Sequence, residues 1–378
     1  MAGIYVHIPF CKKLCNYCDF YHVIACEDHT FFLKALLREA EIRQNYTANE
    51  PVSTIYFGGG TPSVLSVKEL ETVLDYLRTH FSAEPACETT IELNPDDITP
   101  EYLNDLKKTG FTRISIGIQS WREEDLKMLN RRHTVMQASK ALEDTLKTGF
   151  ENITIDLIYG IPGMSLKAWE SNLDQSLAFD IKHLSAYHLT IEPGTVFGRM
   201  KEKGLFKEAD EEKSNAEFNI LVKKTEAAGF MHYEISNFGK PGYFSLHNTN
   251  YWKQVPYIGL GPSAHSFNGY SRQWNISDLN KYIRYVDNGT EFFEKENLDI
   301  KTRFNEYIMT SLRTMWGIDL EYLERTFEKE SYDYVINLSG KFIDYGMMKR
   351  DKKNLVLTNQ GKMISDNIIS EFMVPGDR

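Results

Sequence analysis

The sequence predicts an α/β fold: a partial (β/α) barrel, an α+β region after it, and a small winged-helix-like domain at the C-terminus. Short β-branched segments alternate with amphipathic segments through the first half of the chain, an order typical of a parallel sheet with helical connections. Several of these strands alternate apolar and polar residues, so one face of the sheet must meet polar groups. Near residue 299 the pattern changes to helices followed by a hairpin.

The expected barrel strands are short and bounded by glycine, proline or polar residues. They cover residues 4–8, 54–57, 89–93, 113–118, 152–158 and 183–191. Between them, apolar residues recur at helical spacing, as in residues 31–42, 70–77 and 103–106. Along the fourth strand, isoleucines alternate with Ser115, Gly117 and Gln119. We therefore expect a polar cavity at the carboxyl ends of the strands, where parallel α/β folds bind their ligands.

The second half of the chain is less regular. It predicts a helix at 210–228, strands and loops at 233–275, helices at 303–314, 320–327 and 334–342, and a hairpin at 347–357. Helices followed by a hairpin indicate a winged-helix-like domain, and its roughly balanced charges argue against DNA binding. The changes of pattern predict three parts: a barrel core at 1–195, a barrel-completing α+β region at 196–298, and the C-terminal domain at 299–378.

Length and composition limit the class of protein. The chain has 378 residues, 42% hydrophobic and 25% charged, which is typical of a globular protein of two or three domains. Its formal net charge of -10 argues against nucleic acid as a partner, because chains that bind nucleic acid are usually basic. No stretch approaches the ~20 apolar residues of a membrane span, and the N-terminus lacks a signal-peptide pattern, so a cytoplasmic location is expected.

A cluster of cysteines indicates where the chemistry lies. Three of them follow the first expected strand at the spacing C-x3-C-x2-C: Cys11, Cys15 and Cys18. Thiolates at this spacing suit an iron–sulfur cluster or zinc. A structural zinc site needs a fourth ligand, which His7 or His22 could supply, and a redox or disulfide role is a further alternative. Cys26 and Cys87 lie outside the run and fit small hydrophobic residues.

Further candidate binding residues follow later strands. A Gly-Gly-Gly-Thr-Pro run occupies residues 58–62, and glycines let the backbone approach a ligand closely, although such a run also suits a simple turn. Glu92, Gln119 and Asp156 lie on the polar faces of successive strands. Any one of them could be a solvated residue at a strand end. Three at matching depth favour a binding site.

The order of these motifs resembles the coproporphyrinogen III dehydrogenase-like branch of the radical S-adenosylmethionine (SAM) superfamily, which includes the HemW-type heme chaperones. The resemblance is carried by residues 5–11, the cysteine run, and residues 58–62, 92–95, 115–120, 130–133 and 156–163. It implies a radical SAM barrel with a 4Fe–4S cluster on the three cysteines. The positions that it implies for SAM binding are Tyr5, Tyr17, Gly59, Gly60, Thr61, Glu92, Gln119, Arg131 and Asp156.

Two functions are found within this branch, and the sequence separates them. The dehydrogenase typically carries a fourth cysteine, C-x3-C-x2-C-x-C, and an N-terminal extension. Here Phe20 stands where that cysteine would be, and ten residues precede Cys11. The resemblance therefore implies an intact radical SAM core without coproporphyrinogen III dehydrogenase activity, and no catalytic residue is assigned.

A second motif points to heme. Residues 247–252 match the HNxxYW pattern that is associated with heme binding in HemW-like proteins, through His247, Asn248, Tyr251 and Trp252. Imidazole is a common axial ligand of heme iron, and aromatic rings cover the macrocycle. The competing interpretation is a hydrogen-bonded structural histidine. His7 and His265 are alternative ligands.

The resemblance thus implies a heme chaperone that binds a 4Fe–4S cluster, SAM and heme and delivers heme to acceptor proteins. Any membrane association is expected to be peripheral, through those acceptors. Two alternatives stay open: an oxygen-independent coproporphyrinogen III dehydrogenase of porphyrin biosynthesis, and a radical SAM enzyme on another small substrate, in which the HNxxYW segment is structural.

Overall fold

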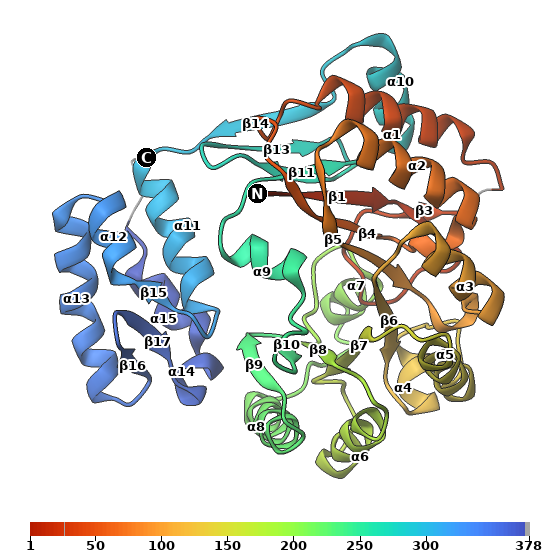
Figure 1. The fold of residues 1–378 in the computed structure, drawn as a ribbon. Helices are drawn as coiled ribbons and strands as arrows, with labels where there is room; N and C mark the ends of the chain where they lie inside the picture. Colours follow the sequence, from red (N-terminus) through yellow and green to blue (C-terminus); the bar gives the residue numbers. More distant parts are fainter. Residues whose placement is uncertain (26, 375–378) are drawn as a thin grey trace.

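The computed structural model describes residues 1–25 and 27–374, so Cys26 lies outside the described residues. Its main feature is a 12-stranded sheet in the order β14-β13-β12-β11-β1-β4-β5-β6-β7-β8-β10-β9. Six neighbouring strands in the middle are parallel and curl into a partial barrel (Figure 1). They are β1 (Ala2–Ile8), β4 (Val52–Gly59), β5 (Ala83–Leu93), β6 (Arg113–Gln119), β7 (Asn152–Tyr159) and β8 (His183–His188). The expected partial barrel is therefore confirmed.

Helices between these strands cover the outer face of the sheet (Figure 1). They are α1 (Thr30–Ile42), α2 (Val67–His80), α3 (Pro100–Thr109), α4 (Glu123–Met128), α5 (Val135–Lys147) and α6 (Leu166–Leu177). Local sequence sets several of their ends. Ser66 and Glu69 form a capping box that starts α2, and α3 stops at Gly110, whose φ of 97° favours glycine.

The alternation along β6 has the predicted consequence. Ile114, Ile116 and Ile118 are fully buried in the core under the helices. Ser115, Gly117 and Gln119 point the other way and line a cavity. β8 is shorter than the strand that was expected at 183–191, because it ends at His188. After it, the Leu189 amide donates to the Tyr159 carbonyl at 2.8 Å.

The region after β8 extends the sheet at both edges. β9 (Met231–Glu234) and β10 (Asn237–Gly239) add antiparallel strands beside β8, after α7 (Val196–Glu202) and α8 (Glu211–Ala227). β11 (Tyr257–Leu260) pairs parallel with the other side of β1, followed by β12 (His265–Phe267), β13 (Ser271–Asn275), α10 (Leu279–Asn288) and β14 (Phe293–Asn297). Short β2 (Phe10–Cys11) and β3 (Val23–Ile24) pair within the cysteine loop, and 3-10 turns follow β4 (η1, Pro62–Val64) and β5 (η2, Pro95–Asp97).

One helix in this region contradicts the sequence-based expectation. Residues 233–275 were expected to contain strands and loops alone, but α9 (Leu246–Trp252) lies among them. The Ser245 side chain accepts from the Asn248 amide at 3.3 Å and so caps its first turn. Seven residues are too few to show a helical period, and the polar side chains and aromatic rings of α9 do not favour a helix.

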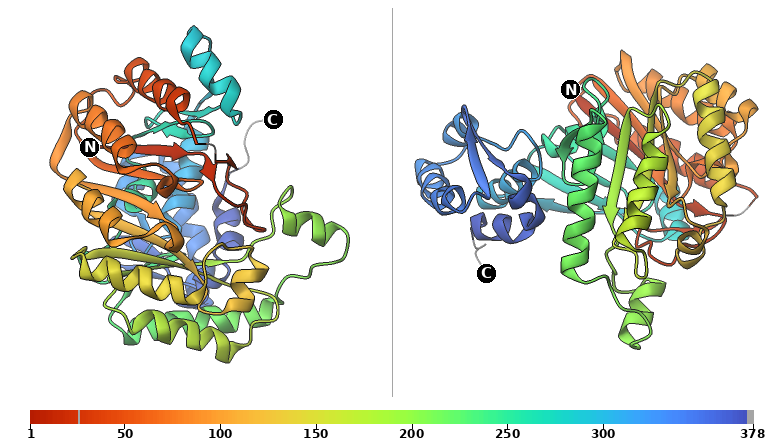
Figure 2. Two further views of the ribbon diagram at one scale, coloured as in Figure 1. Left: turned by 90° about the vertical axis from the view of Figure 1, so that its right-hand side faces the viewer. Right: turned by 90° about the horizontal axis from the view of Figure 1, so that it is seen from below.

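The C-terminal residues form their own core beside the barrel (Figure 2). The expected helices and hairpin are present as α11 (Ile300–Leu312), α12 (Leu320–Thr326), α13 (Lys329–Asp344), β16 (Met348–Asp351) and β17 (Asn354–Leu357). β15 (Ile318–Asp319), α14 (Asn359–Met363) and α15 (Ser365–Phe372) complete this part. Across the described residues, none of the helices combines the length and the apolar character that crossing a membrane requires.

A buried ion pair joins α1 to the β11–β13 side of the sheet. Glu39 is fully buried and accepts from Arg43 at 2.9 Å. The Glu39 carboxylate also accepts hydrogen bonds from the Gly261 amide, Asn275 and Tyr282. The Arg43 guanidinium also donates to Gly259, Ser266 and Gln273. Every strand from β11 to β13 thus contacts one charged pair, which fixes these strands against α1.

We predict that Glu39→Gln destabilises the protein by about 3 kcal/mol, because it leaves the buried Arg43 charge without an anionic partner. The measurement is the midpoint of urea unfolding. Glu41→Gln is the matched control, since Glu41 pairs with Arg38 at the surface and its loss changes the midpoint little. Equal midpoints for the two variants would contradict the role given to the pair.

Candidate functional site

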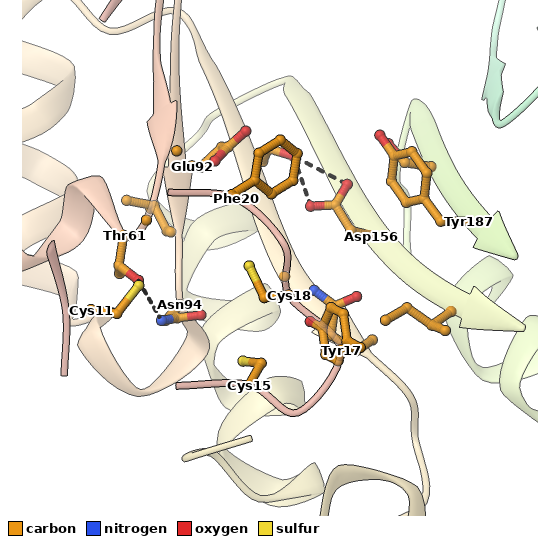
Figure 3. Close-up of a pocket in the computed structure, with 18 of the residues that line it drawn as sticks. Cys11, Cys15, Tyr17, Cys18, Phe20, Thr61, Glu92, Asn94, Asp156 and Tyr187 are labelled. Carbon is orange, nitrogen blue, oxygen red and sulfur yellow. Dashed lines mark hydrogen bonds between the residues drawn. The ribbon is translucent and has the colours of Figure 1, made fainter. Parts of the chain in front are cut away.

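A cavity of about 430 Å³ opens at the carboxyl ends of the parallel strands, a size typical of small-molecule sites. The cysteine loop after β1 forms one wall, and the polar faces of β5 to β8 form the other. Figure 3 shows the three cysteines and Tyr17 on one side of this cavity, with Glu92, Asp156 and Tyr187 across from them.

The cysteine loop is held in place by its neighbours. Cys11, Cys15 and Cys18 all line the cavity as free thiols. The backbone amide of Asn16 donates to the Leu129 carbonyl at 3.1 Å, and the Asn130 side chain donates to the Leu14 carbonyl at 2.7 Å. The segment after α4 therefore holds the middle of the loop, between the sulfur atoms.

Two further contacts reach the sulfur atoms themselves. The Thr61 hydroxyl donates to Cys11 Sγ at 3.5 Å, and Arg131 Nη1 donates to Cys15 Sγ at 3.3 Å. Burial is the main cause that raises the pKa of Cys11 and that of Cys18, the latter to about 12. Without a bound metal these thiols keep their protons, whereas metal binding requires thiolates.

The donor set at this wall is three cysteine side chains, which suits an iron–sulfur cluster. Within the described residues, no group of three or more His, Cys, Asp or Glu side chains could hold a single ion. Of the two histidines considered as a fourth zinc ligand, His7 has both ring nitrogens hydrogen-bonded, whereas His22 lines the cavity and is bonded through Nδ1. His7 Nε2 hydrogen bonds with the Tyr21 carbonyl at 2.9 Å, and His22 Nδ1 with the Phe20 carbonyl at 2.6 Å. Cys87 is buried in β5, as expected for a small hydrophobic residue.

The glycine run after β4 forms the cavity wall beside Cys11. A Cβ at Gly59, whose φ is 107°, would lie 2.5 Å from His7 Nδ1. At Gly60 it would lie 2.8 Å from the Phe10 carbonyl oxygen. Only glycine fits at these two positions, which lets the backbone pass close to the cysteine loop and stay open to the cavity.

The cavity contains two carboxylates, Glu92 and Asp156. Glu92 accepts from the Tyr56 hydroxyl at 2.7 Å, and Asp156 accepts from Ser115 Oγ at 3.2 Å. Burial raises the pKa of Glu92 to about 7 and that of Asp156 to about 6. Neither forms a close salt bridge with any residue that the structure describes, although the positive charges of Arg131 and Arg113 act on Asp156 and partly offset the effect of burial on its pKa. Such carboxylates favour a ligand that brings positive charge.

The cavity contains all of the expected SAM-binding residues except Tyr5. Tyr17, Gly59, Gly60, Thr61, Glu92, Gln119, Arg131 and Asp156 line it. Tyr5 lies on β1 behind the cavity, where its hydroxyl hydrogen bonds with His7 Nδ1 at 3.1 Å. Its ring centre lies 6.2 Å from that of Tyr56, which does line the cavity.

Sequence reasoning missed several lining residues. Asn94 donates to Thr61 Oγ1 at 3.3 Å and accepts from Arg131, so it connects two elements of the site. The others lie on the same polar strand faces as Glu92 and Asp156, and the alternation could have identified them: Thr90, Arg113, Thr154, His183, Ser185 and Tyr187. His183 Nδ1 has no hydrogen-bond partner among the described residues, so the cavity floor also offers an unused polar atom.

The HNxxYW segment is α9, and its histidine is enclosed. His247 is 2% exposed, and its ring stacks on Tyr56 with the centroids 4.9 Å apart. Nδ1 hydrogen bonds with Thr54 Oγ1 at 2.8 Å, and Nε2 with the Tyr251 hydroxyl at 2.9 Å. Burial lowers the pKa of His247 to about 3. Both ring nitrogens are therefore hydrogen-bonded in this structure, an arrangement that agrees with the interpretation of His247 as a structural histidine.

The other residues of the motif face different surfaces. Asn248, in the first turn of α9, lines the barrel cavity. Trp252, at the end of α9, lines a second cavity beside the C-terminal part of the chain. Of the alternative ligands, His7 is buried with both nitrogens bonded, whereas His265 is exposed beside Trp274. The four motif residues therefore do not share one surface.

Comparisons with known proteins identify the family to which the chain belongs. The model of the radical SAM superfamily matches residues 5–175. The heme chaperone HemW of Bacillus subtilis is 31% identical over 99% of both chains, and that of Lactococcus lactis is 32% identical over 98% of this chain and 97% of its own. The solved coproporphyrinogen III oxidase (HemN) of Escherichia coli shares the fold, with a TM-score of 0.84 over 99% of this chain and 90% of its own at 23% identity. The chain belongs to the HemW family of the radical SAM superfamily.

Proposed function

We propose that the protein is a heme chaperone: it binds a 4Fe–4S cluster, SAM and heme, and it passes heme to acceptor proteins. The observation that carries this proposal is the similarity to HemW proteins over nearly the whole chain, which includes the α9 motif and the C-terminal part. A shared fold alone would not support it, because one fold hosts many functions.

The barrel cavity supplies the residues for the cluster and SAM. Cys11, Cys15 and Cys18 would hold the cluster, which supplies an iron with an open coordination position and a source of single electrons. Glu92 and Asp156 face the same space and suit the ammonium and sulfonium charges of SAM. Gly59 and Gly60 leave the backbone open to the ligand.

The main competing function is coproporphyrinogen III dehydrogenation. The likeness to HemN supports only the fold, because the identity is 23%. At the cavity rim, the fourth cysteine of the dehydrogenase pattern is replaced by Phe20, whose side chain is 64% exposed. A phenyl ring cannot take the part of a thiol in redox chemistry or metal binding, so the chaperone function is favoured.

The remaining parts of the proposal concern organisation. We propose the divisions 1–195, 196–298 and 299–378, with the last part resembling a winged helix because the β16–β17 hairpin follows α11 to α13. We also propose a cytoplasmic site of action, and heme-acceptor proteins are the partners that the chaperone function requires.

We predict that replacing Cys11, Cys15 or Cys18 with alanine abolishes the broad visible absorption of the reconstituted cluster, because each removes one thiolate ligand. Iron and sulfide are measured after anaerobic reconstitution, and circular dichroism checks the fold. Cys87→Ala is the control and keeps the cluster, since Cys87 lies outside the cavity. Full iron and sulfide content in the triple variant would refute this assignment.

We also predict that Glu92→Gln and Asp156→Asn weaken SAM binding about 10- to 100-fold, since each amide keeps the volume but loses the charge. Burial raises the pKa of Glu92 to about 7 and that of Asp156 to about 6, so each carboxylate is charged above its own pKa and becomes neutral as the pH falls below it. In calorimetric titrations of cluster-loaded protein, the affinity of the unchanged chain should therefore fall between pH 8 and 5.5. Glu50→Gln, at the surface, is the control. An affinity that is independent of both charge and pH would exclude these carboxylates.

The geometry of α9 leads to a prediction about His247. We expect His247→Ala to destabilise the protein by about 2 to 3 kcal/mol, because it removes two internal hydrogen bonds and leaves a cavity. The Soret band of bound heme should keep its position, since the imidazole is not free to bind iron. His80→Ala, at the surface of α2, should change neither property. A folded His247→Ala protein with a shifted or absent Soret band would instead identify His247 as the ligand.

A further inference from the structure

A second cavity, of about 600 Å³, lies where the C-terminal part of the chain meets the sheet. Its walls come from the end of α9, the β12–β13 turn, α11 and the segment before β15. α9 and α11 lie side by side here (Figure 1). Pro256 lines this groove and lies directly before the first residue of β11. β1 runs parallel to β11, and the cysteine loop follows the last residues of β1. The groove and the barrel cavity therefore lie at opposite ends of these strands.

Aromatic rings line both walls of this groove. Those from the α9 and sheet side are Trp252, Phe267 and Tyr270, and those from the C-terminal side are Tyr307, Trp316, Tyr322 and Phe327. Several are open to the groove: Trp252 and Trp316 are partly exposed, and Tyr270 is 70% exposed. Facing aromatic surfaces of this kind suit a flat apolar ligand.

Two cations at the groove have no acidic partner. Lys253 Nζ lies 4.6 Å from the ring centre of Trp316, and the Arg303 guanidinium lies 5.3 Å from that of Tyr270. Neither forms an ion pair with any of the residues that the structure describes.

The two acidic residues of the lining, in contrast, are already paired. Glu306 pairs with Arg272 at 2.9 Å, and Asp319 pairs with Lys353 at 3.1 Å. The groove therefore presents uncompensated positive charge beside its rings, in a chain whose net charge is -10. This charge is suited to carboxylates on the ligand.

We propose that this groove binds a tetrapyrrole, with the macrocycle between the aromatic walls and the propionate carboxylates at Lys253 and Arg303. The proposal rests on the proposed heme chaperone function and assigns the binding site of heme to this groove. The described lining contains neither histidine nor cysteine, so the affinity comes from the rings and the cations rather than from an imidazole or thiolate bond to iron.

The position of α9 agrees with this placement. Its first turn brings Asn248 to the barrel cavity, and its last turn brings Trp252 to the groove, with His247 packed between them. The helix thus separates the two cavities and contributes to both. In this arrangement the motif contributes a ring to the heme site, and His247 is a positioning residue that holds α9 on β4.

The test compares heme and metal-free protoporphyrin in titrations of the full chain. Trp316→Ala removes a wall, and Lys253→Glu combined with Arg303→Glu reverses the charge at the edge. Each should weaken the binding of both ligands at least tenfold. Protoporphyrin dimethyl ester, which lacks the free carboxylates, should bind the unchanged chain more weakly and should not respond to the charge reversal.

Matched controls lie outside the groove. Trp274→Ala removes a partly exposed tryptophan, and Arg284→Glu with Lys295→Glu reverses two exposed cations. Both should leave the affinities unchanged. Because Trp316→Ala removes a large side chain, its thermal unfolding is compared with that of Trp316→Phe, which should keep the fold and most of the affinity.

The outcomes separate this proposal from the broader one. Heme binding that the groove variants retain in full would overturn the groove site and leave the chaperone function standing. Failure of the unchanged chain to bind heme, while protoporphyrin binds in the groove, would contradict the chaperone function alone. Binding of neither ligand would overturn both.

Discussion

The pairing of β1 with a strand on each side is the constraint on which both candidate sites depend. β1 pairs parallel with β4 and with β11, so its carboxyl end leads into the cysteine loop and the opposite ends of the same strands border the groove. Gly3 permits this arrangement, because a Cβ there would lie 2.9 Å from Thr54 Oγ1 and 3.5 Å from the ring of His247. A larger residue would crowd the Thr54 hydroxyl, which hydrogen bonds with His247 of α9.

A chain of polar and aromatic contacts connects the barrel cavity to α9. Glu92 in the barrel cavity accepts from Tyr56, Tyr56 stacks on His247, and His247 hydrogen bonds with Tyr251. The packing of these groups explains why a histidine inside a heme-associated motif has its pKa lowered to about 3, because burial disfavours its charged form. Its role is to fix α9, whose two ends supply Asn248 and Trp252 to different cavities.

Sequence reasoning succeeded where a short period controls the structure. The alternation of β-strand residues predicted the cavity face and brought Glu92, Gln119 and Asp156 together, because each faces inward by a local rule. It failed where distant segments meet. α9 is too short to show a period, and the groove joins Trp252 to Trp316 across many intervening residues. The enclosure of His247 by Thr54 and Tyr251 likewise depends on tertiary packing that no local pattern contains.

The central claim is that heme and the cluster with SAM occupy separate sites on one chain. The most direct measurement is an anaerobic titration of heme into protein that already holds its cluster and SAM, followed by absorption spectroscopy and by analysis of the SAM that stays bound. The account predicts that a Soret band grows to one heme per chain while the cluster absorption and the bound SAM do not change. Displacement of SAM or loss of the cluster in proportion to the heme added would contradict it.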